Sequence, residues 1–129
     1  MSDAKELKGK SGIKRLINAF SYSKDGFIAA YRSEEAFRQE FWILVIGAII
    51  AAVLPVTLLQ TVSLIAVLLF LLIVEILNSA IEATIDRIGM EIHPLSKHAK
   101  DMGSCAVLFA CALALIVWAA ILIDCFWLV

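Results

Sequence analysis

The chain has 129 residues, 62% of them hydrophobic, and its formal net charge at pH 7 is −1. A soluble domain of this size buries only about two-thirds of the surface of its unfolded chain, so this composition excludes a soluble monomer and favours a membrane protein. The near-zero charge gives no reason to expect nucleic acid as a partner.

Residues 13–31 are predicted to form an amphipathic helix. Apolar residues recur there at helical spacing, and Lys14, Arg15, Lys24 and Arg32 fall between or beside them. We expect this helix to lie at the membrane surface with its basic side chains toward the lipid headgroups. Packing of its apolar stripe on the other helices is a compatible alternative.

Three apolar segments predict three membrane-spanning helices. Residues 41–74 carry no charged side chain, but one helix of these 34 residues would be about 51 Å long, against a hydrocarbon core of about 30 Å. Pro55 therefore favours a turn that divides this run into spans at about 36–54 and 58–88. A third span is expected at about 100–124. The whole chain is then one all-α integral membrane domain.

The basic residues indicate how these helices are oriented. Eight of the eleven precede Phe41, and the other three are Arg87, Lys97 and Lys100. The positive-inside rule therefore places the N-terminus and a loop at 87–101 in the cytoplasm, and three spans place the C-terminus on the opposite side.

Polar residues follow one face of the second span toward its cytoplasmic end. Glu75, Asn78, Glu82 and Asp86 lie within an arc of about 80° on a helical wheel, and we call them the polar ladder. Helix–helix hydrogen bonding would be enough to explain Asn78 and Ser79 alone. Because an ionisable residue inside a membrane costs about 2.5–3.5 kcal/mol, the complete ladder favours a functional site.

The chemistry of the polar ladder suits a hard cation. Mg²⁺ binds through one or two carboxylates together with phosphate oxygens, and a carboxylate held away from water can also act as a general base. His93, His98 and Lys100 belong to the predicted loop and would face anionic phosphate; a zinc pair of the two histidines is the less favoured alternative. The residues alone indicate either a metal–phosphate site or a proton or cation path. Three more carboxylates flank the start of the first span: Glu34, Glu35 and Glu40.

Several motifs carry a resemblance to a known family. Residues 75–87 read EILNSAIEATIDR, followed by HPLS at 93–96 and AKDMGS at 99–104, and residues 34–40 read EEAFRQE. Over about residues 13–125 the chain resembles the prokaryotic diacylglycerol kinase family. Ile92 departs from the pattern, because an aromatic residue is expected there.

The resemblance implies a small integral enzyme of the bacterial inner membrane. Such an enzyme transfers the γ-phosphate of ATP to the hydroxyl of diacylglycerol and gives phosphatidic acid, in membrane lipid recycling. It also implies a homotrimer with three transmembrane helices and one surface helix per subunit, and with active sites shared between subunits.

The resemblance further implies roles for individual residues. Glu75 is expected to be the general base that accepts the proton of the lipid hydroxyl, and Asn78 to orient Glu75 or the phosphate. Glu34 and Glu82 are expected to hold Mg²⁺ on the ATP phosphates. Lys100 would contact the γ-phosphate and Ser104 the lipid substrate. The remaining residues expected to help bind the nucleotide are Arg15, Tyr22, Glu91, His93 and Asp101.

Two alternative functions stay open from the sequence. The same fold could phosphorylate undecaprenol, although residues 87–93 and 100–104 resemble the Gram-negative lipid-recycling branch of the family, which favours diacylglycerol. A small proton or cation channel or transporter could use the same polar ladder, and it would conduct ions without ATP turnover.

Overall fold

The computed structural model describes residues 12–89 and 93–128, which are almost entirely helical. Three of the helices, α3, α4 and α5, are long and apolar enough to cross a membrane. The expected all-α membrane fold with three spanning helices is therefore confirmed. The helices are α2 (Gly12–Ser33), α3 (Glu35–Val53), α4 (Leu58–Ile88) and α5 (Pro94–Phe126).

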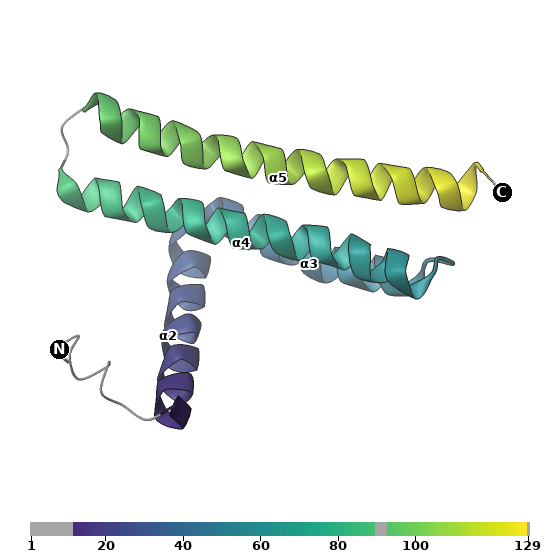
Figure 1. The fold of residues 1–129 in the computed structure, drawn as a ribbon, viewed down its shortest axis with the longest axis horizontal. Coiled ribbons are helices and arrows are strands. Elements are labelled where there is room, and N and C mark those ends of the chain that lie inside the picture. The colour runs from purple at the N-terminus through teal and green to yellow at the C-terminus, as the bar shows by residue number, and fades with distance from the viewer. Residues whose placement is uncertain (1–11, 90–92, 129) are drawn as a thin grey trace.

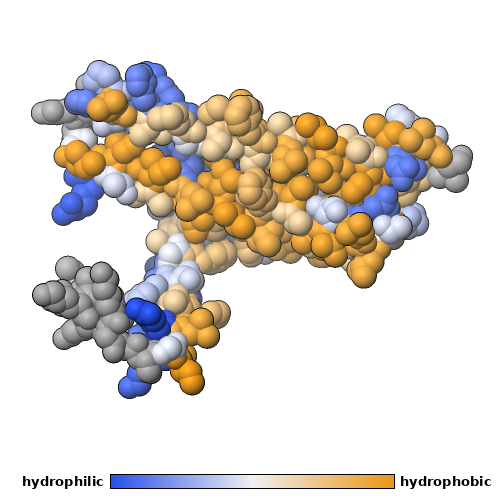
Figure 2. All heavy atoms as spheres, in the orientation of Figure 1, coloured by the Kyte–Doolittle hydropathy of each residue, from blue (hydrophilic) through white to orange (hydrophobic). Residues whose placement is uncertain are grey.

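The three apolar helices form a bundle with α4 at its centre, and α2 leaves this bundle steeply (Figure 1). If the bundle crosses the membrane along its long axis, α2 runs along the membrane surface. Polar residues gather at the two ends of the bundle, and apolar residues cover the length between them (Figure 2). This arrangement is the one expected for three spans and a surface helix.

A capped turn separates α3 from α4. The Thr57 hydroxyl accepts from the Gln60 backbone N–H at 3.2 Å, and the Gln60 side chain accepts from the Thr57 backbone N–H at 3.0 Å. These reciprocal bonds satisfy two N–H groups that a helix start leaves without intrahelical partners. The uncharged run of the sequence is thus divided beside Pro55.

The corner between α2 and α3 is held by hydrogen bonds and aromatic packing. Arg38 Nη1, in the first turns of α3, donates to the Tyr31 carbonyl oxygen near the end of α2 at 2.7 Å. The ring of Phe27 packs edge-to-face on that of Phe37, with centroids 5.4 Å apart. This corner fixes the position of Glu34, the single residue between the two helices.

The predicted cytoplasmic loop is much shorter than expected. Residues 94–101 form the first two turns of α5, whereas the sequence predicts a loop at 87–101. Pro94 is tolerated because the first helical position needs no N–H donor, and His93 Nδ1 caps the helix by accepting from the Leu95 N–H at 3.1 Å. With 33 residues α5 is about 50 Å long, so it extends beyond a hydrocarbon core of about 30 Å.

Candidate active site

Part of the polar ladder is buried inside the helix bundle. Glu75 is 6% exposed, Asn78 is 8% exposed, and the neighbouring Ser79 is also 8% exposed. These side chains lie on α4, which packs against both α3 and α5. Polar groups removed from water need partners, so this part of the bundle is the candidate site.

A carboxyl group from α3 joins Glu75. The Glu40 and Glu75 carboxyl groups lie near enough to act on each other electrostatically, and both act on the Cys111 thiol of α5. Glu40 Oε2 is buried and has no hydrogen-bond partner within the described residues. Two adjacent carboxyl groups in a poorly hydrated place favour a shared proton or a bound cation. The sequence placed Glu40 at the start of the span but assigned it no role.

The polar ladder continues from this pair toward the α4–α5 connection. Asn78 Nδ2 donates to Glu82 Oε1 at 3.4 Å, within α4. One turn further along α4, Asp86 Oδ1 pairs with Lys100 Nζ of α5 at 2.6 Å. Lys100 therefore reaches the end of the polar ladder, and it carries the positive charge that a phosphate group there would require.

Glu34 approaches the polar ladder from the α2–α3 corner. It occupies the N-cap position of α3, but its side chain makes no capping hydrogen bond to that helix. It lines a cavity of about 240 Å³ between α2 and α4 together with Ser79. Its charge acts on Glu75, as does that of Glu82. Glu34 and Glu82 are thus the two further carboxylates whose charges act on Glu75.

The donor set fits magnesium. Within residues 12–89 and 93–128, no three or more His, Cys, Asp or Glu side chains are grouped to hold a metal ion by themselves. Mg²⁺ keeps several waters and binds through one or two carboxylates plus substrate phosphates, so it does not need a complete protein cage. Zinc prefers three or four protein ligands, and within the described residues His93 and His98 have no third such side chain grouped with them.

The other predicted site residues that the structure describes lie on α2 and in or beside the first turns of α5. Arg15 is in the first turn of α2, and Tyr22, which is 52% exposed, is in the middle of that helix. The helix α2 as a whole leaves the bundle steeply (Figure 1). Ser104 is exposed on α5. Asp101 pairs with Lys97 at 2.6 Å. His93 caps α5, and the predicted nucleotide residue Glu91 lies outside the described residues, as does Ile92.

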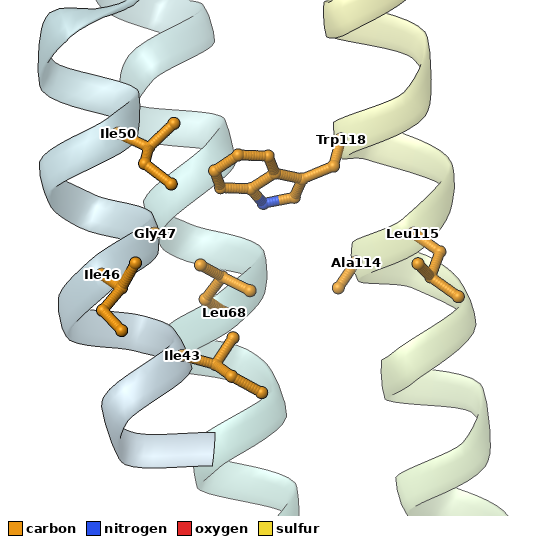
Figure 3. Close-up of a pocket in the computed structure, with 8 residues that line it drawn as sticks. All are labelled: Ile43, Ile46, Gly47, Ile50, Leu68, Ala114, Leu115 and Trp118. Atoms are coloured by element: carbon orange, nitrogen blue, oxygen red, sulfur yellow. The ribbon is translucent and has the colours of Figure 1, made fainter. Parts of the chain in front are cut away.

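An apolar cavity lies deeper in the bundle than the carboxyl groups. Its volume is about 300 Å³, and Trp118 of α5 and the isoleucines of α3 face one another across it (Figure 3). Leu68 is two turns of α4, about 10.5 Å, from Glu75 toward the α3–α4 turn. The lining is apolar, so it can contact hydrocarbon chains, but it has no charged side chain that could bind a phosphate. It consists of Ile43, Ile46, Gly47, Ile50, Leu68, Ala114, Leu115 and Trp118.

Comparison with known proteins shows the family. A family model described as prokaryotic diacylglycerol kinase matches residues 21–122. The chain belongs to the prokaryotic diacylglycerol kinase family. It is 51% identical over 118 residues to the diacylglycerol kinase of Pseudomonas aeruginosa, covering 92% of this chain and 96% of that protein. It is 49% identical over 112 residues to the diacylglycerol kinase of Escherichia coli K12, covering 87% and 92%.

The family match also extends to more distant relatives. The diacylglycerol kinase of Haemophilus influenzae is 39% identical over 112 residues, which cover 87% of this chain and 95% of that protein. The resemblance found in the motifs is therefore confirmed. In this kinase family member, residues 21–122 include Glu40 and the whole polar ladder, whereas Arg15 precedes the matched residues.

Proposed function

We propose that this chain is an ATP-dependent diacylglycerol kinase that transfers the γ-phosphate of ATP to the lipid hydroxyl and releases phosphatidic acid and ADP. The observation that carries the proposal is the polar ladder itself. It begins at buried carboxyl groups beside an apolar cavity and ends at the Asp86–Lys100 pair at the α4–α5 end of the bundle. A lipid hydroxyl and a water-soluble phosphate donor can meet along such a line. The relatives that carry this enzyme name support the assignment.

In this mechanism Glu75 is the general base. The lipid approaches from the bilayer with its chains at the depth of the apolar cavity, so that its hydroxyl is near Glu75. Glu75 accepts the hydroxyl proton as the oxygen bonds to the γ-phosphorus, and the bond from that phosphorus to the bridging oxygen of ADP breaks. Phosphoryl transfer depends mainly on positioning and charge neutralisation, so no covalent phospho-enzyme is needed. Asn78 orients Glu75 or the phosphate.

ATP is held at the other end of the polar ladder. Glu34 and Glu82 would hold Mg²⁺, and the ion would offset the negative charge of the ATP phosphates. Lys100 exchanges its ion pair with Asp86 for a contact between its ammonium group and the γ-phosphate. The side chain can move in this way because it is 42% exposed. The other proposed contacts are Ser104 to the lipid and, to the nucleotide, Arg15, Tyr22, Glu91, His93 and Asp101.

We propose a homotrimer in which neighbouring subunits complete each site. Arg15 and Tyr22 lie on α2, and this helix leaves the bundle steeply (Figure 1). Large apolar side chains on α3 and α5 are exposed in the single chain, as Ile46 and Phe109 illustrate at 55% and 69%. Helices of other subunits would cover such surfaces and bring Arg15 and Tyr22 to a shared site.

The proposed location is the bacterial inner membrane. The N-terminus and the short α4–α5 connection would lie in the cytoplasm, since all eleven Lys and Arg residues fall in these two regions or at their edges. ATP would then be available to the Lys100 end of the polar ladder.

A substrate comparison on one purified preparation tests the function. The protein in mixed micelles is given ATP, Mg²⁺ and either diacylglycerol or undecaprenol, and phosphorylated lipid is measured. We expect phosphatidic acid to form much faster than undecaprenyl phosphate. The control variant is Glu35→Gln, which neutralises an exposed carboxylate on α3 and should keep the rate. Preference for undecaprenol, or ion flux in vesicles without any lipid product, would contradict the proposal.

A further inference from the structure

We propose that Gly103 of α5 is a positioning residue for Asn78. Its missing side chain lets the α5 backbone close against the Asn78 amide and hold it turned toward Glu82. The inference rests on the proposed function, in which Asn78 and Glu82 serve phosphoryl transfer, and it adds a residue that touches neither substrate.

The close approach is specific to one side chain. Gly103 is buried, and a Cβ atom at this position would overlap Asn78 Oδ1 and lie 3.2 Å from Asn78 Cγ and 3.9 Å from Asn78 Cβ. These three nearest atoms all belong to Asn78. The hydrogen of the Gly103 Cα that a methyl group would replace therefore points at the amide oxygen, as in a weak Cα–H···O contact.

The Asn78 amide has few other restraints. Its Oδ1 atom is buried and has no hydrogen-bond partner within the part of the chain that the structure describes. Its Nδ2 atom donates to Glu82 Oε1 over 3.4 Å, which is long for such a bond. A loosely bonded amide needs a second restraint to keep one orientation, and the backbone at Gly103 supplies it.

An added methyl group would turn the amide away from Glu82. Asn78 lies within α4, and its amide can turn away from the added methyl group about χ2, a torsion that is broad in asparagine. Nδ2 would then move from Glu82, a proposed magnesium ligand. The other buried helical glycine differs: a Cβ at Gly47 would meet Leu68 Cδ1, the free end of a flexible apolar side chain.

A double-mutant cycle tests the inference on the full-length protein. Gly103→Ala should lower the kcat for phosphatidic acid about 10- to 100-fold, the loss typical of a displaced site group. In the Asn78→Ala background, which removes the two atoms that the methyl group would crowd, the same substitution should change the residual kcat by less than about twofold. The control is Gly26→Ala on α2, where a Cβ meets nothing within 4 Å, and it should keep the wild-type rate.

Thermal unfolding of the wild type, of Gly103→Ala, of Asn78→Ala and of the double variant gives a readout that does not depend on activity. Gly103→Ala should lower the Tm of the wild type and leave that of Asn78→Ala unchanged. If Gly103→Ala fails to fold, the double variant should fold, because the crowded atoms are gone.

Equal losses of kcat and Tm in both backgrounds, or failure of both proteins that carry Gly103→Ala to fold, would overturn the inference and make Gly103 a general packing residue. A wild-type protein that makes no phosphatidic acid would refute the proposed function and with it the catalytic part of the inference. Additive losses in an active wild type would refute the inference alone.

Discussion

Replacing Glu75 with glutamine distinguishes a catalytic role of the buried carboxyl group from a structural one. Glutamine keeps the size of the side chain and its ability to hydrogen-bond, but it cannot accept the proton of a lipid hydroxyl. Glu75 is 6% exposed and lies beside Glu40, so the change also removes one of two adjacent carboxyl groups.

Glu75→Gln should lower the activity of the protein without lowering its stability. Loss of a general base should lower kcat by about 10²–10⁴-fold, which is about 2.7–5.4 kcal/mol in the activation free energy. An ionisable group inside a membrane costs about 2.5–3.5 kcal/mol, so the variant should be at least as stable as the wild type. ATP binding should survive, because Glu82 lies two turns, about 10.5 Å, further along α4.

The assay measures lipid phosphorylation, nucleotide binding and thermal unfolding on one preparation of each variant. Glu40→Gln is the informative comparison, because it leaves Glu75 able to accept a proton and should therefore lose less activity. A Glu75→Gln protein that keeps its turnover would remove Glu75 from the mechanism. One that unfolds would make Glu75 structural, and a larger loss in Glu40→Gln would identify Glu40 as the base.

Three further predictions concern the metal, the nucleotide and the topology. Glu82→Gln should raise the Mg²⁺ concentration needed for half-maximal rate, because it removes a charged oxygen ligand, and an unchanged Mg²⁺ titration would refute that role. Lys100→Met should raise the KM for ATP at least about tenfold, since a charge-assisted contact to phosphate is lost; an unchanged KM would place the γ-phosphate elsewhere. In a variant without native cysteines, a cysteine at Lys97 should be labelled from the cytoplasm and one at Leu128 from the opposite side. Labelling of both from one side would contradict three spans.

Much of the fold follows from patterns local to the sequence. The uncharged run with Pro55 in its middle predicts a helical hairpin, and Thr57 with Gln60 supplies the local signal that starts α4. The sequence predicts the third span from about residue 100, with Pro94 in the loop before it, whereas α5 begins at Pro94. Proline is also common in the first turn of a helix. The hydrogen bond that the Leu95 N–H donates to His93 caps a helix that begins at Pro94, so Pro94 is helical here.

The candidate site could be predicted only where its residues share one helix. The spacing of Glu75 and Glu82 on α4 already places both on one face. The approach of Glu40 to Glu75 depends on how α3 packs on α4, and the contact between Gly103 and Asn78 depends on α5, so neither is encoded in a local pattern. A charged residue directly before a long uncharged run is the signal that singles out Glu40.

The most direct test of the account follows the phosphate itself. Purified protein in micelles containing diacylglycerol is given Mg²⁺ and ATP labelled with ³²P at the γ-position, and the label is located in the extracted lipid. We expect the label to appear in phosphatidic acid in step with the release of ADP, and Glu75→Gln to slow both by about 10²–10⁴-fold. Release of labelled inorganic phosphate without labelled lipid, or labelled lipid formed equally fast by Glu75→Gln, would contradict it.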